Sequence, residues 1–255
     1  MSLKDIIELT EQKYLECFSE KVENSNFIRF RDSLLPGMYA FNCTIIKDAG
    51  LACLEEVVKS EIKYSKDEGK DFCQIYMQFT TENIFDEKKE YEATAMGYYA
   101  LDFDAFFAPK IMPDCDILRL DTPKMAQDML LHDLEVDGEF IGEDFCTKRA
   151  KRRSDVYLSN IGLERYLCYS NNEIIGKCEL FMCEGSAKIE DLEISPRYYH
   201  KGYGHALLSE VIRIAQCRGA KTIYLATDEA DTPKEMYKKM GFFRAHESTE
   251  LLLKF

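Results

Sequence analysis

The stretch from Asp191 to Arg218, DLEISPRYYHKGYGHALLSEVIRIAQCR, contains residue types that can bind an anion. Gly202 and Gly204 lack side chains, so several backbone N–H groups can converge there on one phosphate group. The apolar spacing that follows predicts a helix whose N-terminus directs its positive dipole end at the same point. The basic residues Lys201, Arg197 and His200 stand nearby. These features together predict a phosphate-binding turn.

A G-x-G pair alone has a second interpretation, because most such pairs only permit a tight turn. The strand before the pair, the helix after it and the basic residues between them favour phosphate binding. The spacing excludes two common nucleotide sites. The dinucleotide-binding motif needs a further glycine, and the nucleotide triphosphatase loop needs Gly-Lys followed by Ser or Thr.

A second segment lies downstream. In DTPKEMYKKMGF, residues 231–242, Tyr237 is followed four and five residues later by Gly241 and Phe242. Together with the strand, the YYHKGYG turn and the helix, this segment resembles the GNAT superfamily of N-acetyltransferases, whose pyrophosphate loop has the pattern Arg/Gln-x-x-Gly-x-Gly/Ala. Tyr199 occupies the first position of that pattern, a departure that leaves the backbone cradle intact. The resemblance covers about residues 116–255.

The resemblance implies acetyl-CoA as the cofactor and a backbone N–H of the strand near Leu192 to Ile194 as the group that polarises the thioester carbonyl. It makes Tyr237 the general acid that protonates the departing thiolate. An aromatic residue on a short helix more often belongs to the core, but Gly241-Phe242 after it favours the catalytic role. The residues implied in cofactor binding are Leu192, Ile194, Tyr199, His200, Lys201, Gly202, Tyr203, Gly204 and His205.

Transfer to an amine also needs a base, because an alkylammonium group with a pKa of about 10.4 has no lone pair. Glu190 and Asp191 precede the turn on its strand. Successive strand residues point to opposite faces, so only one of the two acids is expected to face the acceptor. We favour Glu190, although many relatives carry the acid at the position of Lys188, and two solvent-facing acids are the alternative. Direct transfer is predicted, with no metal and no covalent enzyme intermediate.

The surrounding pattern predicts an α/β fold with a mixed, splayed sheet of the GNAT type flanked by helices. The motifs fall between strand 188–194, the helix after Gly204, strand 222–227 and helix 232–240. Gly138 is expected to separate two earlier helices. The other predicted elements are a strand at 116–120, helices at 123–136 and 142–158, and strands at 165–169, 174–183, 242–247 and 250–255.

The N-terminal part predicts a second, smaller α/β domain. Prolines between Asp104 and Cys115 mark the boundary, which gives an N-terminal domain at 1–114 and an acetyltransferase domain at 115–255. The alternation of strands and helices suggests a degenerate internal copy without a G-x-G cradle, and therefore without CoA. A scaffold role is favoured over covering a sheet edge, lining the acceptor pocket or dimerisation. The predicted elements are helices at 2–21, 50–66 and 82–92 and strands at 38–46, 71–79 and 95–103.

The composition limits which binding partners and which cellular compartment are expected. The net charge of −13 argues against general nucleic-acid binding. The charge is −9 up to Asp114 and −4 beyond it, so cations remain for a polyanionic cofactor while the acidic excess favours a cationic acceptor. Ten cysteines are scattered through apolar segments, no apolar run is long enough to span a bilayer, and the N-terminus does not resemble a secretion signal. We expect a reduced, cytoplasmic protein without membrane association.

Two further sets of residues are interpreted structurally. The basic run KRAKRR, Lys148 to Arg153, is expected to form a solvated helix face, with contact to the cofactor phosphates as the alternative. The histidines show no metal-ligand spacing and are expected at the surface. They are His132, His200, His205 and His246.

The expected function is acetyl-CoA-dependent transfer of an acetyl group to a primary amine of a small molecule or peptide. Two alternatives belong to other classes: a non-catalytic acyl-CoA-binding protein, and a partner-binding protein with a relic GNAT fold. Acetyl-CoA binding separates the enzyme from the relic, and acetylation of an amine separates it from the sensor. The sequence leaves open the acceptor, the choice between Glu190, Asp191 and a water as base, and homodimerisation.

Overall fold

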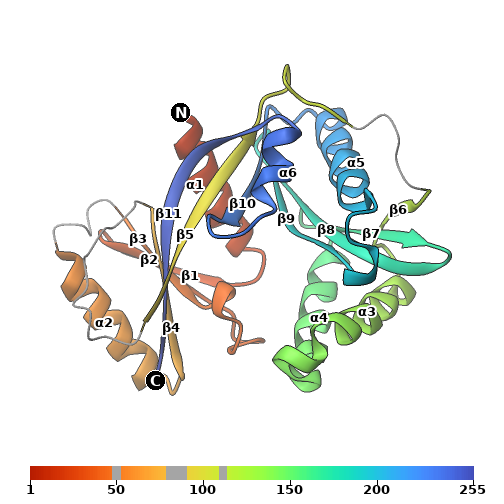
Figure 1. The fold of residues 1–255 in the computed structure, drawn as a ribbon. Helices are drawn as coiled ribbons and strands as arrows, with labels where there is room; N and C mark the ends of the chain where they lie inside the picture. Colours follow the sequence, from red (N-terminus) through yellow and green to blue (C-terminus); the bar gives the residue numbers. More distant parts are fainter. Residues whose placement is uncertain (48–52, 79–90, 109–113) are drawn as a thin grey trace. The chain divides into compact units, whose positions relative to one another are not determined.

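The computed structural model describes residues 1–47, 53–78, 91–108 and 114–255 (Figure 1). The chain forms two compact units, each assembled from three segments. Met1–Cys17, Ala100–Leu225 and Glu235–Phe243 make up the first unit. Phe18–Tyr99, Ala226–Lys234 and Arg244–Phe255 make up the second. The predicted division into domains at 1–114 and 115–255 stays a prediction.

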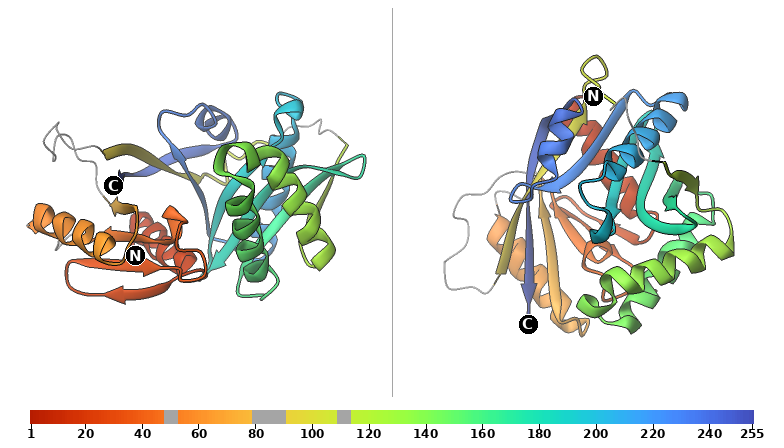
Figure 2. Two further views of the ribbon diagram at one scale, coloured as in Figure 1. Left: turned by 90° about the horizontal axis from the view of Figure 1, so that it is seen from below. Right: turned by 45° about the vertical axis from the view of Figure 1, so that its right-hand side comes forward.

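The first unit contains a mixed sheet. Strands β6, β7, β8 and β9 form an antiparallel meander, and β10 pairs parallel to β9. Helix α5 packs on one face of this sheet, and α1, α3 and α4 pack on the other (Figure 1, Figure 2). The elements, of which β10 and α6 extend into the second unit, are α1 (Leu3–Leu15), β6 (Asp116–Arg119), α3 (Pro123–Ile141), α4 (Glu143–Tyr157), β7 (Leu163–Ser170), β8 (Glu173–Cys183), β9 (Ser186–Ile194), η3 (Pro196–Tyr198), α5 (Tyr203–Cys217), β10 (Thr222–Asp228) and α6 (Lys234–Lys239).

The second unit also pairs two strands in parallel, β3 and β4, while β1, β2 and β11 join its sheet in antiparallel fashion. Its core is apolar and is built from side chains of α2, β3, β4 and β11. Strands β5 and β11 also contribute residues to the first unit. The elements are β1 (Glu20–Glu23), β2 (Phe27–Arg31), η1 (Tyr39–Phe41), β3 (Cys43–Ile46), α2 (Leu54–Asp67), β4 (Phe72–Met77), β5 (Tyr91–Leu101) and β11 (Phe242–Lys254).

Local signals explain where the long helices begin. At α1, the Ser2 hydroxyl accepts a hydrogen bond from the Asp5 N–H, and the Asp5 carboxylate accepts one from the Ser2 N–H, which is a capping box. At α3, the Thr122 hydroxyl accepts from the Met125 N–H, and Pro123 occupies the first turn. The predicted α/β class, with mixed sheets flanked by helices, is confirmed.

Some local predictions are wrong, and some elements were not predicted. Gly138 lies inside α3, and the helix ends instead at Gly142, whose φ of +83° cannot continue it. The two strands expected at 242–247 and 250–255 form one strand, β11, because Thr249 continues the ladder opposite Met77. Strand β1 was not predicted, since it is short, charged and exposed and therefore shows no alternation. Strand β2 was also missed, although its residues alternate between buried and partly buried positions.

Some predictions concern residues outside the described part of the chain. The helix predicted at 82–92 falls there except for Tyr91 and Glu92, which begin β5. The helix predicted at 50–66 is described from Leu54 onward as α2. No helix of the described residues has the length and apolar character needed to cross a membrane. Four cysteines expected in the core are buried: Cys43, Cys73, Cys168 and Cys178.

Candidate functional site

Strand β9 carries a β-bulge at the end nearest the predicted turn. Between Glu190 and Glu193, β9 has one residue more than the facing part of β8, and Asp191 adopts a φ of +53°. A bulge of this kind interrupts the ladder and redirects a side chain. Asp191 thereby reaches Arg165, which lies opposite Glu179 on the face that also carries Glu190. Both acids thus reach the same face of β9, so strand alternation does not separate them, and which of them faces an acceptor stays a prediction.

The parallel pairing of β9 with β10 covers only part of β9. It runs from Ser186↔Thr222 to Ile189↔Leu225. Beyond Ile189, β8 remains the ladder partner of β9, and the described register with β10 ends. Leu192 and Ile194, predicted to contact the cofactor, lie in this second half of β9. Backbone groups there are free of the parallel ladder, as carbonyl binding to a strand N–H would require.

Glu190 lies in a partly buried cluster of charges. The Lys188 Nζ lies 2.9 Å from Glu190 Oε2 and 2.7 Å from Glu11 Oε2, and the Tyr224 hydroxyl donates to Glu11 Oε1 at 2.8 Å. Burial raises the pKa of Glu190 above its usual value, although Lys188 opposes the shift. The Glu190 side chain retains 32 % of its exposure, so it can still meet a substrate.

Asp191 belongs to a second, deeper cluster around Arg165, a residue only 1 % exposed. One guanidinium nitrogen of Arg165 lies 2.6 Å from Asp191 and 2.8 Å from Glu179. Arg153 also lies 2.6 Å from Asp191, and Tyr14 donates to Glu179 at 2.6 Å. Burial would raise the pKa of Asp191, but Arg153 and Arg165 hold it well below its usual range. Asp191 is therefore a fixed anion and a poor proton acceptor.

A third group extends this network along β8. Lys177 donates to Asp133 at 2.5 Å and lies 3.3 Å from Glu193, while His132 Nε2 lies 3.1 Å from the other Glu193 oxygen. Burial would raise the pKa of Glu193, but hydrogen bonding by His132 and the charge of Lys177 lower it. His132 is buried, which contradicts its predicted surface position, because Glu193 gives its ring a polar partner inside the fold.

Three buried charged residues of the site were not predicted: Lys177 and Glu179 on β8, and Arg165 on β7. A signal was present, because Lys177 and Glu179 interrupt an otherwise apolar strand, and charges in such strands are almost always paired. The prediction for the basic run, residues 148–153, is wrong at one residue. Arg153 is buried against Asp191 instead of belonging to a solvated face.

After β9 the chain enters α5 through two residues in the left-handed region, His200 with a φ of +59° and Gly202 with a φ of +89°. Gly202 is the N-cap, and no side chain caps this helix. The helical bonding begins with the Ala206 N–H and the Gly202 carbonyl, so the N–H groups before Ala206 point out of the helix end. This backbone geometry fits an anion such as a pyrophosphate.

Gly204 lies between two elements that border the turn. A Cβ added there would lie 3.7 Å from the Ile194 Cγ1 of β9 and 3.9 Å from the Met236 Sδ of α6. One methyl group would fit, while a branched side chain would press on both neighbours. The second glycine of the motif therefore keeps the helix end close to β9 and α6.

The side chains of the turn lie mostly at the surface. Lys201 Nζ donates to the Arg197 carbonyl at 2.8 Å, and the Arg197 guanidinium lies 3.4 Å from Glu173. Tyr199, His200 and Lys201 are exposed, and Tyr203, Gly204 and His205 are partly buried. The structure thus brings the predicted cofactor-binding residues to one loop and helix end. Their contacts with a cofactor stay predictions.

Tyr237 lies on α6, the helix that borders the turn at Gly204. It is 7 % exposed, and its ring packs edge-on against Phe242 with centroids 6.0 Å apart. Gly241 has a φ of +99°, and a Cβ there would approach the Ala105 carbonyl oxygen to 2.6 Å. The Gly-Phe pair of the second motif is therefore required by packing, and the acid role of Tyr237 stays a prediction.

The described residues contain no group of three or more His, Cys, Asp or Glu side chains arranged to hold a metal ion. The ionisable groups of the site instead neutralise one another in the three clusters around Lys188, Arg165 and Lys177.

Comparison with known proteins finds a family model and a curated relative that match the central part of the chain. The Acetyltransferase (GNAT) family model matches residues 126–242. The uncharacterized N-acetyltransferase CgeE of Bacillus subtilis (strain 168) is 33 % identical over 111 residues, which make up 42 % of this chain and 42 % of that protein. The chain thus spans less than half the length of this relative.

Solved structures share the fold over nearly the whole chain. A functionally unknown conserved protein from Staphylococcus epidermidis ATCC 12228 has a TM-score of 0.75 at 17 % identity and covers 92 % of this chain and 94 % of its own. A GCN5-related N-acetyltransferase from Kribbella flavida has a TM-score of 0.64 at 10 % identity, with 98 % and 95 % covered. The N-terminal part of the chain therefore belongs to the shared fold.

Proposed function

Because the acetyltransferase (GNAT) family model matches residues 126–242 of this chain, we propose that the protein is an acetyl-CoA-dependent N-acetyltransferase acting on a primary amine by direct transfer. One observation carries the proposal. The helix end of α5 has no side-chain cap, is reached through left-handed His200 and Gly202, and follows the half of β9 that β10 leaves unpaired. This combination suits a long ligand with a pyrophosphate and an acyl end.

The residues around the turn fit acetyl-CoA, which supplies an acetyl thioester activated for acyl transfer. The N–H groups of Tyr203, Gly204 and His205 are suited to hold the pyrophosphate oxygens. A backbone N–H between Leu192 and Ile194 is suited to hold the thioester carbonyl, because β10 does not occupy that part of β9. The exposed Tyr199, His200 and Lys201 complete the rim of the phosphate site.

Glu190 is the proposed base. Its carboxylate faces Lys188, is partly exposed and has a raised pKa, so it accepts a proton more readily than an ordinary surface carboxylate. Asp191 is a poor base by comparison, since two arginines stabilise its ionised form. Tyr237 is the proposed acid, which donates its phenolic proton to the departing thiolate. It belongs to the short helix that borders Gly204.

The charges beside β9 favour a cationic acceptor. The three clusters contain six carboxylates and four Lys or Arg side chains. An ammonium group near Glu190 would reduce this negative excess, and Glu190 could then remove its proton. The carboxylates are Glu11, Asp133, Glu179, Glu190, Asp191 and Glu193, and the cations are Arg153, Arg165, Lys177 and Lys188.

The first test is calorimetric binding of acetyl-CoA to the whole chain and to Gly204→Val. We expect micromolar binding by the wild type and a loss of at least about 100-fold in the variant, roughly 2.7 kcal/mol. Gly138→Val is the matched control, because a Cβ at Gly138 meets its nearest atoms at 3.7 Å, as at Gly204, but outside the turn. Its affinity should stay within about threefold of wild type.

Thermal unfolding of both variants should show that they fold. Equal acetyl-CoA affinity of Gly204→Val and Gly138→Val would show that the turn does not bind the cofactor. If the whole chain binds acetyl-CoA, a panel of amines followed by mass spectrometry should reveal an acetylated product. Absence of acetyl-CoA binding would overturn the proposed function.

A further inference from the structure

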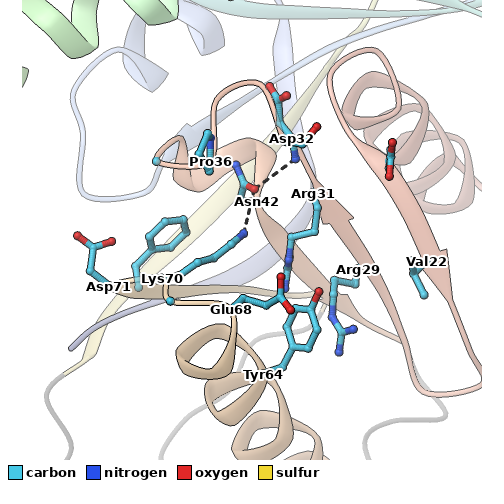
Figure 3. A pocket seen from close by; sticks show the side chains of 15 residues that line it. Val22, Arg29, Arg31, Asp32, Pro36, Asn42, Tyr64, Glu68, Lys70 and Asp71 are labelled. Carbon is cyan, nitrogen blue, oxygen red and sulfur yellow. Dashed lines mark hydrogen bonds between the residues drawn. The ribbon is translucent and has the colours of Figure 1, made fainter.

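A pocket of about 740 Å³ lies within the second unit, where β2, the end of α2 and the start of β4 meet (Figure 3). Its volume is in the range of pockets that bind small molecules. Arg31 and Lys70 point into it beside Asn42 and Tyr64. The pocket shares no residue with the proposed acetyl-transfer site.

Arg31 is held firmly but lacks a close anion. Its Nη1 donates to the carbonyl oxygens of Phe30 at 2.6 Å and Cys43 at 3.0 Å. Its buried Nε has no hydrogen-bond partner among the described residues. Glu61 approaches Arg31 only to 3.9 Å, because Arg29 binds both oxygens of that carboxylate. Arg31 is therefore a largely buried cation with incomplete neutralisation.

Lys70 lies beside Arg31 and is also incompletely neutralised. Its Nζ donates to the neutral Asn42 Oδ1 at 3.0 Å, and the Asn42 amide is fixed by donation to the carbonyls of Leu35 and Met38. Within the described chain, no carboxylate forms an ion pair with Lys70. Burial, followed by repulsion from Arg31, lowers the pKa of Lys70 to about 8. Two cations thus face one cavity, and the charge of Arg31 disfavours the charged form of Lys70.

Carboxylates also line this pocket and shape what it can accept. They are Glu20, Asp32, Glu68 and Asp71. Asp32 accepts a hydrogen bond from the Leu34 N–H, and in Figure 3 the Asp71 carboxylate points away from Lys70 and Arg31. The charge of Glu68 acts on Lys70, but among the described residues neither Glu68 nor Asp71 forms an ion pair with Arg31 or Lys70. An outside anion can therefore still pair with both cations.

We propose that this pocket binds a small organic anion, with its carboxylate or phosphate group between the Arg31 guanidinium and the Lys70 ammonium. The two donors have fixed positions, since backbone carbonyls hold Arg31 and Asn42 holds Lys70. An oxyanion there would form charge-assisted hydrogen bonds and relieve the repulsion between the cations. Tyr64 lines the pocket beside Arg31, and the Arg29 guanidinium lies over its ring at 3.7 Å from the centroid.

The test is a calorimetric titration of the whole chain with inorganic phosphate and, separately, with succinate. It is made at pH 7, below the pKa of Lys70, where the ammonium form predominates. We expect saturable binding of one probe, and the tighter probe identifies the anionic group. Lys70→Met should weaken binding at least about tenfold, and Lys70→Arg, which keeps the charge, should stay within about threefold.

Lys63→Met is the matched control, because Lys63 lies on α2 with an exposed side chain paired to Asp67. It should bind the probe like wild type. Thermal unfolding of each variant verifies the fold. Binding that is equal in Lys70→Met and Lys63→Met, or no saturable binding of either probe, would overturn the proposal. Neither outcome depends on acetyl transfer.

Discussion

In the first unit, β9, α5 and β10 form a parallel strand pair joined by a helix, and in the second unit β3, α2 and β4 repeat that arrangement. The interior beneath the joining helix is apolar in both units: α5 buries Leu207, Val211 and Ile212, and α2 packs on a cluster of isoleucine, valine, leucine, methionine and cysteine side chains. The first unit has a charged interior as well. The face of its sheet covered by α1 and α3 carries Lys177, Glu179 and Lys188 inside the fold. The repeat accords with an internal copy, which stays a prediction.

The comparison shows where each unit places its buried charged residues. Buried charges are costly unless each has a partner, so a network of this size is expected where it positions reacting groups. In the first unit it holds Asp191 ionised and leaves Glu190 with a raised pKa. In the second unit, the buried Glu61 carboxylate accepts hydrogen bonds from Arg29 and Thr44, and Arg31 approaches it only to 3.9 Å.

The largest effect should come from removing the proposed base. Glu190→Gln should lower kcat/KM for the accepted amine by about 10²–10⁴-fold, because an amide cannot accept the ammonium proton. In the wild type, activity should fall as the pH drops through the pKa of Glu190, which lies above the ordinary 4.5. The measurement is a pH profile of kcat/KM for both proteins.

Glu184→Gln is the control for that profile, since Glu184 is an exposed residue of the turn between β8 and β9. It should retain the wild-type rate and acid limb. If Glu190→Gln also retained both, the base would have to be a water or another group. The buried charges of the first unit would then affect stability and not catalysis.

A smaller effect, on stability, should follow from opening the deep cluster of the first unit. Arg165→Met should lower the free energy of unfolding by about 3–5 kcal/mol, because it removes the more deeply buried of the two arginines that neutralise the buried Glu179 and the partly buried Asp191. Urea unfolding measures the change. Arg218→Met is a close control, since Arg218 also contacts a carboxylate, Glu164, and a tyrosine hydroxyl but is 40 % exposed.

The control should cost less than about 1 kcal/mol, as exposed ion pairs do. Equal losses for Arg165→Met and Arg218→Met would show that burial adds nothing to the cluster. The charged interior would then be no more sensitive than the surface.

Much of the first unit could be predicted because its elements are long and periodic. The apolar positions of α5, from Leu207 to Ala215, are buried as expected, and the turns of the meander fall where Asn171 and Gly185 indicated. The bulge at Asp191 could not be predicted, since strand alternation assumes a regular pleat. The contact between Glu179 and Tyr14 could not be predicted either, because the two residues are 165 positions apart in the sequence.

The site was predicted unevenly for a related reason. Gly202 and Gly204 act through the backbone, so their spacing alone indicates a helix end that can bind an anion. Glu190 depends on side chains from other elements, and the sequence named it without naming Lys188 or Glu11 as the groups that set its environment. Arg31 and Lys70 belong to no motif, and only the fold brings them to one pocket.

The smallest effect should come from trimming the apolar interior of the second unit. Ile75 is fully buried in the core of β4, so Ile75→Val should cost about 0.5–1.5 kcal/mol in urea unfolding, through one lost methylene group and the small cavity it leaves. Ile161→Val, at a position 49 % exposed, should change stability by less than about 0.5 kcal/mol. A loss at Ile75 as large as that at Arg165 would mean that both interiors are equally intolerant. A graded loss would mean that the apolar interior adapts to local change while the charged interior depends on each of its partners.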